Sequence, residues 1–305
     1  MISVFAVSGI GEITPGTDLA GLLADEVQDG DIVLVTSKVV SKAEGRVLEI
    51  DRDEAVQQET DREVARRGGT RIVRNRLGLT IAAAGVDVSN TEPGTVVLLP
   101  VDPDASARAL REALPVNAAV IVTDTAGRAW RHGQTDIAIG AAGLEVAHDY
   151  AGKADSYGNP LAVTLPAIAD ELAGAGDVVK GKLDGFPVAV VRGLASWVLP
   201  RGEHGPGAAT LVREEDQDLF GYGAREAVMH ALLGDERRGF GAPAMADVLV
   251  EALGALGVEA SVEAAVDGNE IVAADTVRCR IAAFAHGWEV AEERGDLVRL
   301  RPVLT

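Results

Sequence analysis

The sequence predicts an α+β fold. Short apolar runs typical of buried strands are interspersed with segments of helical periodicity, but their order lacks the regular alternation that builds a continuous parallel sheet. The chain has 305 residues, enough for one large domain with a smaller one attached. We therefore expect a main domain over residues 1–235 and a small C-terminal α+β extension of unknown role over residues 240–305.

Strands are predicted wherever a short apolar, β-branched run is bounded by turn residues. In the main domain these runs are residues 4–7, 32–36, 96–100, 119–123, 161–164 and 188–191, and in the extension residues 271–273, 277–283 and 297–300. Cys279 lies in one of these runs, where an inert thiol is the default expectation.

Helices are predicted where apolar residues recur at helical spacing or where charges complement a helix dipole. These segments are residues 18–27, 51–67, 102–114, 166 to about 176, 224–233 and 245–256. In the third of them, Asp102 and Asp104 precede the apolar positions, so they are predicted first as capping residues and only second as ligands.

Composition limits the class of protein. Hydrophobic residues make up 47% of the chain and charged residues 25%, as in a soluble globular protein. No apolar run approaches the length of a membrane span and no signal-peptide pattern opens the chain, so we expect a cytoplasmic protein with no membrane partner. A net charge of −19 argues against nucleic acid as a partner, and the single cysteine excludes an internal disulfide.

The chemistry of the chain centres on residues 119–135, where an apolar run leads into a carboxylate, a hydroxyl, a glycine and two arginines. Asp124 and Thr125 offer hard oxygen ligands suited to Mg²⁺ or Mn²⁺. Arg128 and Arg131 offer forked donors that match phosphate or carboxylate groups. We predict catalytic roles for Asp124, Arg128 and Arg131 at a strand tip. An ordinary strand-to-loop corner with structural ion pairs is the alternative.

Lysine is scarce, and four of the five lysines fall in two pairs, Lys38 with Lys42 and Lys180 with Lys182. The first pair directly follows a predicted buried strand, a placement that suits phosphate contacts at the carboxyl end of a sheet. Chance clustering of lysines on solvated loops is the alternative.

Acidic residues elsewhere in the chain complement these two lysine pairs. They are Asp87, Asp124 and a third at either Asp155 or Asp170. Carboxylates with a hydroxyl would hold a divalent metal, while lysines and arginines would hold the other oxygens of a phosphate chain. No Ser–His or Cys–His nucleophile pattern stands out. The residues together predict phosphoryl transfer.

Four phrases of the sequence resemble the coenzyme F420-0:L-glutamate ligase family, including the N-terminal ligase domain of its two-domain mycobacterial form. They are TSKVVSKAEGR at residues 36–46, AGVDVSN at 84–90, LPVDPDAS at 99–106 and TDTAGRAWR at 123–131. The resemblance runs in collinear order over roughly residues 4–233. It implies a mixed-sheet α+β ligase domain and a homodimer. Residues after 239 do not resemble the flavin-binding nitroreductase domain of the two-domain form.

The resemblance implies a GTP-dependent amide ligase of coenzyme F420 biosynthesis. GTP would phosphorylate the lactyl carboxylate of coenzyme F420-0, and the amine of L-glutamate would attack the acyl phosphate to give an amide, GDP and phosphate. Mg²⁺ or Mn²⁺ is implied, with K⁺ as a further candidate ion. The alternatives from other classes are a metal-dependent phosphohydrolase and a non-catalytic GTP-binding module.

The resemblance also assigns site residues. The implied metal ligands are Asp87, Asp124 and Thr125. The implied GTP contacts are Ile10, Gly11, Glu12, Ile13, Ser37, Lys42 and Asn90. An archaeal form of the family places a glutamine among its metal ligands where this chain has Lys182. Because a protonated lysine cannot bind a metal, we leave Lys182 out of the metal set and expect residues 180–183 to contact the nucleotide weakly.

Overall fold

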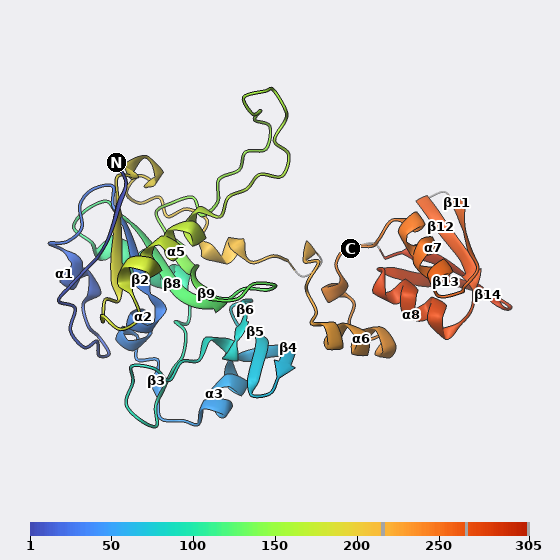
Figure 1. Cartoon of the computed structure of the whole chain (residues 1–305), viewed down its shortest axis with the longest axis horizontal. Coiled ribbons are helices and arrows are strands. Elements are labelled where there is room, and N and C mark those ends of the chain that lie inside the picture. The colour runs from blue at the N-terminus through green and yellow to red at the C-terminus, as the bar shows by residue number, and fades with distance from the viewer. Residues whose placement is uncertain (215–216, 266–267, 304–305) are drawn as a thin grey trace. The chain divides into compact units, whose positions relative to one another are not determined.

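The computed structural model describes residues 1–214, 217–265 and 268–303. Its contacts divide the chain into two compact units, the first comprising Met1–Glu63 and Gly68–Val212, and the second Val64–Arg67 and Arg213–Thr305. Each unit combines helices with sheets, which confirms the predicted α+β class (Figure 1). The predicted domain boundary at residues 235–240 falls inside the second unit.

A five-stranded mixed sheet forms the centre of the first unit. In spatial order its strands are β1 (Ser3–Ala6), β10 (Val188–Arg192), β2 (Ile32–Thr36), β8 (Ala119–Gly127) and β9 (Gln134–Ala142). Strands β2 and β8 run parallel, whereas the other neighbours are antiparallel. The three middle strands are apolar on both faces because helices cover both sides of the sheet.

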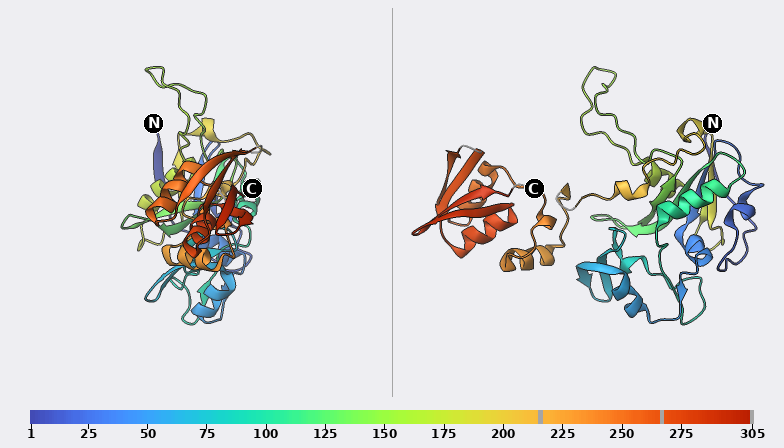
Figure 2. Two further views of the ribbon diagram at one scale, coloured as in Figure 1. Left: turned by 90° about the vertical axis from the view of Figure 1, so that its right-hand side faces the viewer. Right: turned by 180° about the vertical axis from the view of Figure 1, so that it is seen from behind.

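Helices pack on the two faces of this sheet (Figures 1 and 2). One face carries α1 (Leu19–Leu23), α2 (Ser37–Ala43) and α4 (Pro103–Ala113). The opposite face carries α5 (Ile168–Lys180). The predicted cap of α4 is confirmed, because the side chain of Asp102 accepts a hydrogen bond from the Ala105 amide. Asp104 instead accepts hydrogen bonds from the amides of Ala141 and Ala208 and so holds two other segments to this helix.

Helix α5 is longer than predicted. The sequence placed its end near residues 174–176, but the helix continues to Lys180. A Cβ atom at Gly176 would come within 2.5 Å of Leu34 Cδ1 in the sheet. The glycine therefore allows close packing of helix on strand and does not end the helix. This extra turn brings Lys180 to the sheet.

Three other predicted elements are wrong. Residues 51–67 form α3 (Arg52–Glu59) and then β4 (Thr60–Arg67), because charge order along the chain does not reveal strand pairing. Residues 161–164 are not a strand but belong to a long loop, residues 149–165, that extends from the body of the first unit (Figure 1). Residues 277–283 are helical, in α8 (Val277–Ala285), where Thr276 caps the helix by accepting a hydrogen bond from the Cys279 amide.

There are two smaller sheets besides the central one, and all of their residues except Val64–Arg67 of β4 belong to the first unit. One contains β4, β5 (Thr70–Asn75) and β6 (Thr80–Ala82), and the other pairs β3 (Val47–Leu48) with β7 (Val96–Val97). Short 3₁₀ turns lie at Ala83–Gly85, Ala195–Trp197 and Ala208–Leu211.

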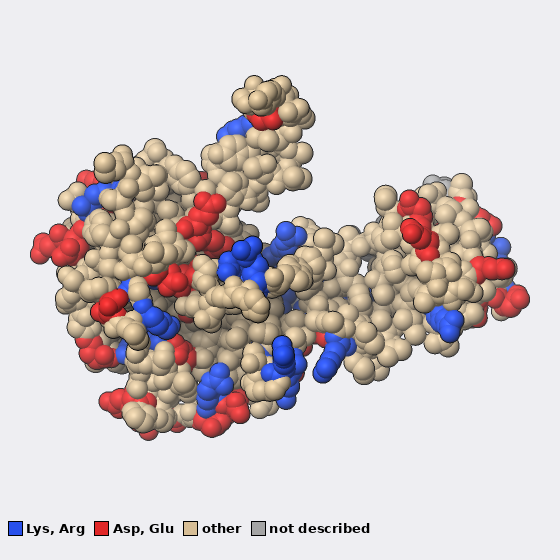
Figure 3. All heavy atoms as spheres, in the orientation of Figure 1, with Lys and Arg blue, Asp and Glu red and all other residues tan. Residues whose placement is uncertain are grey.

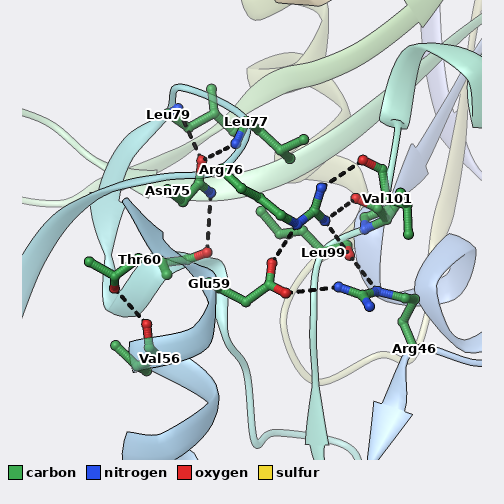
Figure 4. A network of polar contacts seen from close by, with 12 residues as sticks. Arg46, Val56, Glu59, Thr60, Asn75, Arg76, Leu77, Leu79, Leu99 and Val101 are labelled. Atoms are coloured by element: carbon green, nitrogen blue, oxygen red, sulfur yellow. Dashed lines mark hydrogen bonds and ion pairs between the residues drawn. The ribbon is translucent and has the colours of Figure 1, made fainter. Parts of the chain in front are cut away.

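The buried Glu59 side chain, at the end of α3, joins these parts (Figure 4). It accepts hydrogen bonds from Arg46 Nη2 at 3.0 Å and from Arg76 Nε at 2.7 Å. Arg76 also donates to the backbone oxygens of Leu99 and Val101. The network therefore ties α3 and β5 to the segment that precedes α4.

The second unit is built on an antiparallel sheet with the strand order β11 (Ala260–Ala265), β12 (Gly268–Ala274), β14 (Leu297–Pro302) and β13 (Trp288–Arg294). Its helices are α6 (Ala224–Leu233), α7 (Ala246–Ala255) and α8, with a 3₁₀ turn at Arg238–Phe240. Leu249, Leu253, Ile271 and Cys279 are buried in its core. The predicted helices at 224–233 and 245–256 and the strands at 271–273 and 297–300 are confirmed.

Surface features agree with the composition. Throughout the described ranges, each helix is too short or too polar to cross a membrane. On the visible face of the first unit, acidic and basic side chains are interspersed (Figure 3).

Candidate functional site

A cavity of about 570 Å³ lies at the carboxyl ends of the parallel strands β2 and β8. Its walls come from the loop after β1, the end of β2 with α2, the β8–β9 pair, and the end of α5 with the loop that follows it. Of the predicted site residues, the cavity is lined by Ile10, Gly11, Glu12, Ile13, Lys42, Asn90 and Thr125. Folding thus brings most of the predicted nucleotide contacts to one place, next to a predicted metal ligand.

Asp124 and Thr125 lie within β8 and not at a loop tip, because the strand continues to Gly127 and pairs with β9. This corrects the predicted strand end. Successive residues of a strand point to opposite faces, so Asp124 faces the α2 side and Thr125 the α5 side. Ser37, the first residue of α2, donates a hydrogen bond to Asp124 Oδ1 at 2.8 Å.

The electrostatic environment of Asp124 favours its neutral form. Burial raises the pKa of this carboxyl group most, and the negative charges of Asp136 and Asp87 raise it further. The hydrogen bond from Ser37 has the opposite effect and lowers it. Together they raise the pKa of Asp124 to about 6. Negative charge is therefore concentrated around this carboxyl group.

Asp87 is held by two partners on its Oδ2 atom. Lys38 Nζ lies 2.8 Å from this oxygen, and the Ser89 hydroxyl donates to it at 3.0 Å. The Ser89 amide donates to Asp87 Oδ1 at 2.7 Å. Burial alone would raise the pKa of Asp87, but these hydrogen bonds and the Lys38 charge bring it below its usual value. Lys38, from the first predicted lysine pair, thus occupies the side of Asp87 toward α2.

Two buried residues of the site, Asp136 and Lys180, were not predicted as a pair. Lys180 Nζ lies 2.8 Å from Asp136 Oδ2, and both side chains line the cavity although each is about 5% exposed or less. Asp136 is not among the site residues that the sequence predicts, and Lys180 is predicted only as part of a weak nucleotide contact. Helical spacing carried a signal, because Ala173, Gly176 and Lys180 follow one another at intervals of three and four residues on the buried face of α5.

Other predicted residues lie apart from the cavity. Arg128 and Arg131 are in the exposed turn between β8 and β9, where Arg128 donates to the His132 carbonyl at 2.9 Å. Asp155 accepts hydrogen bonds from the amides of nearby residues in the exposed loop 149–165. Asp170 accepts from the Ala138 amide at 2.8 Å. Lys182 does line the cavity.

The donor chemistry fits a hard divalent cation bound together with phosphate. In the described part of the chain, no cluster of three His, Cys, Asp or Glu side chains could hold a metal by itself. The candidate donors are instead two carboxylates and a hydroxyl, from Asp87, Asp124 and Thr125, and Mg²⁺ commonly takes few carboxylates plus substrate oxygens. Burial is the main cause of the raised pKa of Asp124, the negative charges of Asp136 and Asp87 add to it, and a bound cation would offset those charges.

Comparison with known proteins points to one family. The family described as F420-0:gamma-glutamyl ligase matches residues 9–193, the part of the chain that contains the cavity. The coenzyme F420:L-glutamate ligase of Methanopyrus kandleri is 39% identical over 236 residues, which cover 68% of this chain and 93% of that protein. The proteins of that name from Natronomonas pharaonis and Archaeoglobus fulgidus are 38% and 37% identical, covering 72% and 63% of this chain and 94% and 88% of their own lengths.

Proposed function

The chain belongs to the F420-0:gamma-glutamyl ligase family, and we propose that it joins L-glutamate to the lactyl carboxylate of coenzyme F420-0 with GTP as co-substrate. The observation that carries this proposal is the cavity at the ends of β2 and β8. There, lysines suited to phosphate line the same cavity as the proposed metal ligand Thr125, and Asp124 is the residue before it in β8, although the chain contributes these groups from distant positions.

The proposed reaction has two steps. The γ-phosphoryl group of GTP is first transferred to an oxygen of the lactyl carboxylate, and GDP leaves. The amine nitrogen of L-glutamate, having lost a proton, then attacks the carbonyl carbon of this acyl phosphate, and the C–O bond to phosphate breaks. The products are an amide, GDP and phosphate.

The first step brings two anions together, so it needs fixed positive charge. Lys42 and Lys182 line the cavity, and Lys38 reaches it from α2. Their ammonium groups would reduce the repulsion between the carboxylate and the phosphate chain. The backbone at residues 10–13 and the side chain of Asn90, which line the same cavity, would also contact the nucleotide.

We propose Asp87, Asp124 and Thr125 as the residues that hold Mg²⁺ or Mn²⁺. The bound cation supplies neutralisation of charge on the phosphate oxygens. Ser37 keeps the Asp124 carboxylate in place through the hydrogen bond to its Oδ1 atom. K⁺ as a further ion and a homodimeric state belong to the same proposal.

Mass spectrometry of the products tests the activity. Purified protein is incubated with coenzyme F420-0, L-glutamate, GTP and Mn²⁺, and each component is omitted in turn. We expect a product heavier by one or more glutamyl units only in the complete mixture. Release of GDP without glutamate would instead identify a phosphohydrolase, and GTP binding without turnover would identify a nucleotide-binding module.

A further inference from the structure

A closed network of hydrogen bonds connects the end of α5 to β8 and β9. Lys180 Nζ donates to Asp136 Oδ2 at 2.8 Å and to Thr123 Oγ1 at 2.9 Å. Thr123 Oγ1 in turn donates to Asp136 Oδ2 at 2.9 Å, which closes a triangle. The other oxygen of the carboxylate, Asp136 Oδ1, accepts a hydrogen bond from Thr125 Oγ1 at 2.9 Å.

The direction of the last hydrogen bond is fixed by the chemistry of its partners. An ionised carboxylate has no hydrogen to donate, so the Thr125 hydroxyl must be the donor to Asp136. Its two lone pairs are then left for another partner. Thr125 is exposed and lines the cavity, so a cation in the cavity can reach these lone pairs.

The pairing with Lys180 fixes the position of the Asp136 carboxylate. Thr123 is fully buried, and the exposed fractions of the Asp136 and Lys180 side chains are 4% and 5%. Lys180 also occupies Asp136 Oδ2, so this carboxylate is held in the wall of the cavity.

We infer that Asp136 is a positioning residue that orients the Thr125 hydroxyl toward the divalent cation, and that Lys180 holds the Asp136 carboxylate in place. This inference rests on the proposed function, because it assumes that Thr125 binds the metal through its hydroxyl. Carboxylates that fix a metal ligand by a hydrogen bond are a general means of raising metal affinity.

Direct measurement of Mn²⁺ binding, from the electron paramagnetic resonance signal of the free ion, tests the inference without turnover. The main variant is the double substitution Asp136→Asn with Lys180→Met, which removes both buried charges and avoids leaving one unpaired. We expect its Mn²⁺ affinity to fall about 10- to 100-fold, the usual effect of removing a group that orients a metal ligand.

Thr125→Val distinguishes positioning from general damage. If Asp136 acts through the Thr125 hydroxyl, Thr125→Val alone should weaken Mn²⁺ binding to a similar degree, and adding it to the double variant should cause little further loss. Asp31→Asn is the matched control. It alters a buried ion pair with Arg192 next to the amino end of β2, away from the cavity, and should leave Mn²⁺ affinity unchanged.

Three results would count against these assignments in distinguishable ways. Normal Mn²⁺ affinity in the folded double variant would overturn the positioning role alone. Losses that multiply when Thr125→Val is added would overturn it too, because the two sites would then act independently. No Mn²⁺ binding by the unaltered chain would overturn the proposed metal site itself, and the inference with it.

Discussion

Ser37 donates its hydroxyl hydrogen to Asp124 across 2.8 Å, so the first residue of α2 holds a carboxylate in the middle of the neighbouring strand. The two residues are 87 positions apart in the chain. They meet because β2, which leads into α2, runs parallel to β8. The carboxyl ends of parallel strands lie at one edge of the sheet, and the residues that follow them therefore converge.

Asp124→Asn should separate activity from stability. We expect glutamate addition to fall by at least about 100-fold, since an amide is a poor substitute for a carboxylate at a metal site.

The folded pKa of Asp124 is raised to about 6, so its contribution to stability is fully present below its unfolded pKa and is lost as the pH rises through about 6. In metal-free buffer at pH 7.5 the variant should therefore melt at the same temperature as the parent or higher, as scanning fluorimetry can show. Asp53→Asn, in the exposed first turn of α3, is the control, and near-normal turnover in Asp124→Asn would contradict the metal assignment.

Lys42→Ala should mainly raise the KM for GTP. Lys42 lines the cavity and forms an ion pair with Glu12, so its loss removes one phosphate contact while the chemistry of the reacting groups is untouched. An increase of about 10-fold corresponds to one such charged contact. Glu12→Gln is the matched variant, because it removes the ion pair and keeps the lysine. The KM is measured by steady-state kinetics with varied GTP. An equal change of KM in the two variants would contradict the phosphate contact.

Glu59→Gln should destabilise the first unit without a direct effect on the cavity. The substitution leaves Arg46 and Arg76 without their negative partner, and because both arginines stay partly exposed we expect a cost of about 1 to 3 kcal/mol (Figure 4). Denaturant unfolding gives the change in the free energy of unfolding. Glu54→Gln, on the exposed side of the same helix, should change it by less than about 0.5 kcal/mol. Equal stability of the two variants would show that the network contributes nothing.

Gly176→Ala should destabilise the fold more than Gly174→Ala. A Cβ at Gly176 would meet Leu34 at 2.5 Å in a fully buried layer, whereas a Cβ at Gly174 would meet only the Thr135 hydroxyl at 3.2 Å. Both variants gain the same helix propensity, so the difference isolates the steric contact, which we expect to cost about 1 to 3 kcal/mol. The comparison uses the same denaturant measurement. A more stable Gly176→Ala would mean that α5 does not pack against Leu34 as closely as described.

Local patterns along the sequence determined much of the core of the first unit. The strand at residues 32–36 and the capped helix after Asp102 form as predicted, because apolar periodicity and side-chain capping act over a few residues. The same kind of pattern predicted a chemical role for Asp124 and Thr125, which are neighbouring residues of β8. It also identified Lys42 through the scarcity of lysine.

Only the tertiary structure decided how these groups face one another. Pairing with β9 extends β8 past Asp124, places Thr125 opposite Asp136, and brings both within reach of Lys180 on α5. Strand pairing likewise explains why residues 60–67 form a strand, although the order of their charges predicted a helix. Strand pairing and the burial of a charge depend on partners far away in the chain, and local sequence does not contain the position of those partners. The residues suited to the chemistry could therefore be predicted from the sequence, whereas the buried ion pair behind them became visible only in the fold.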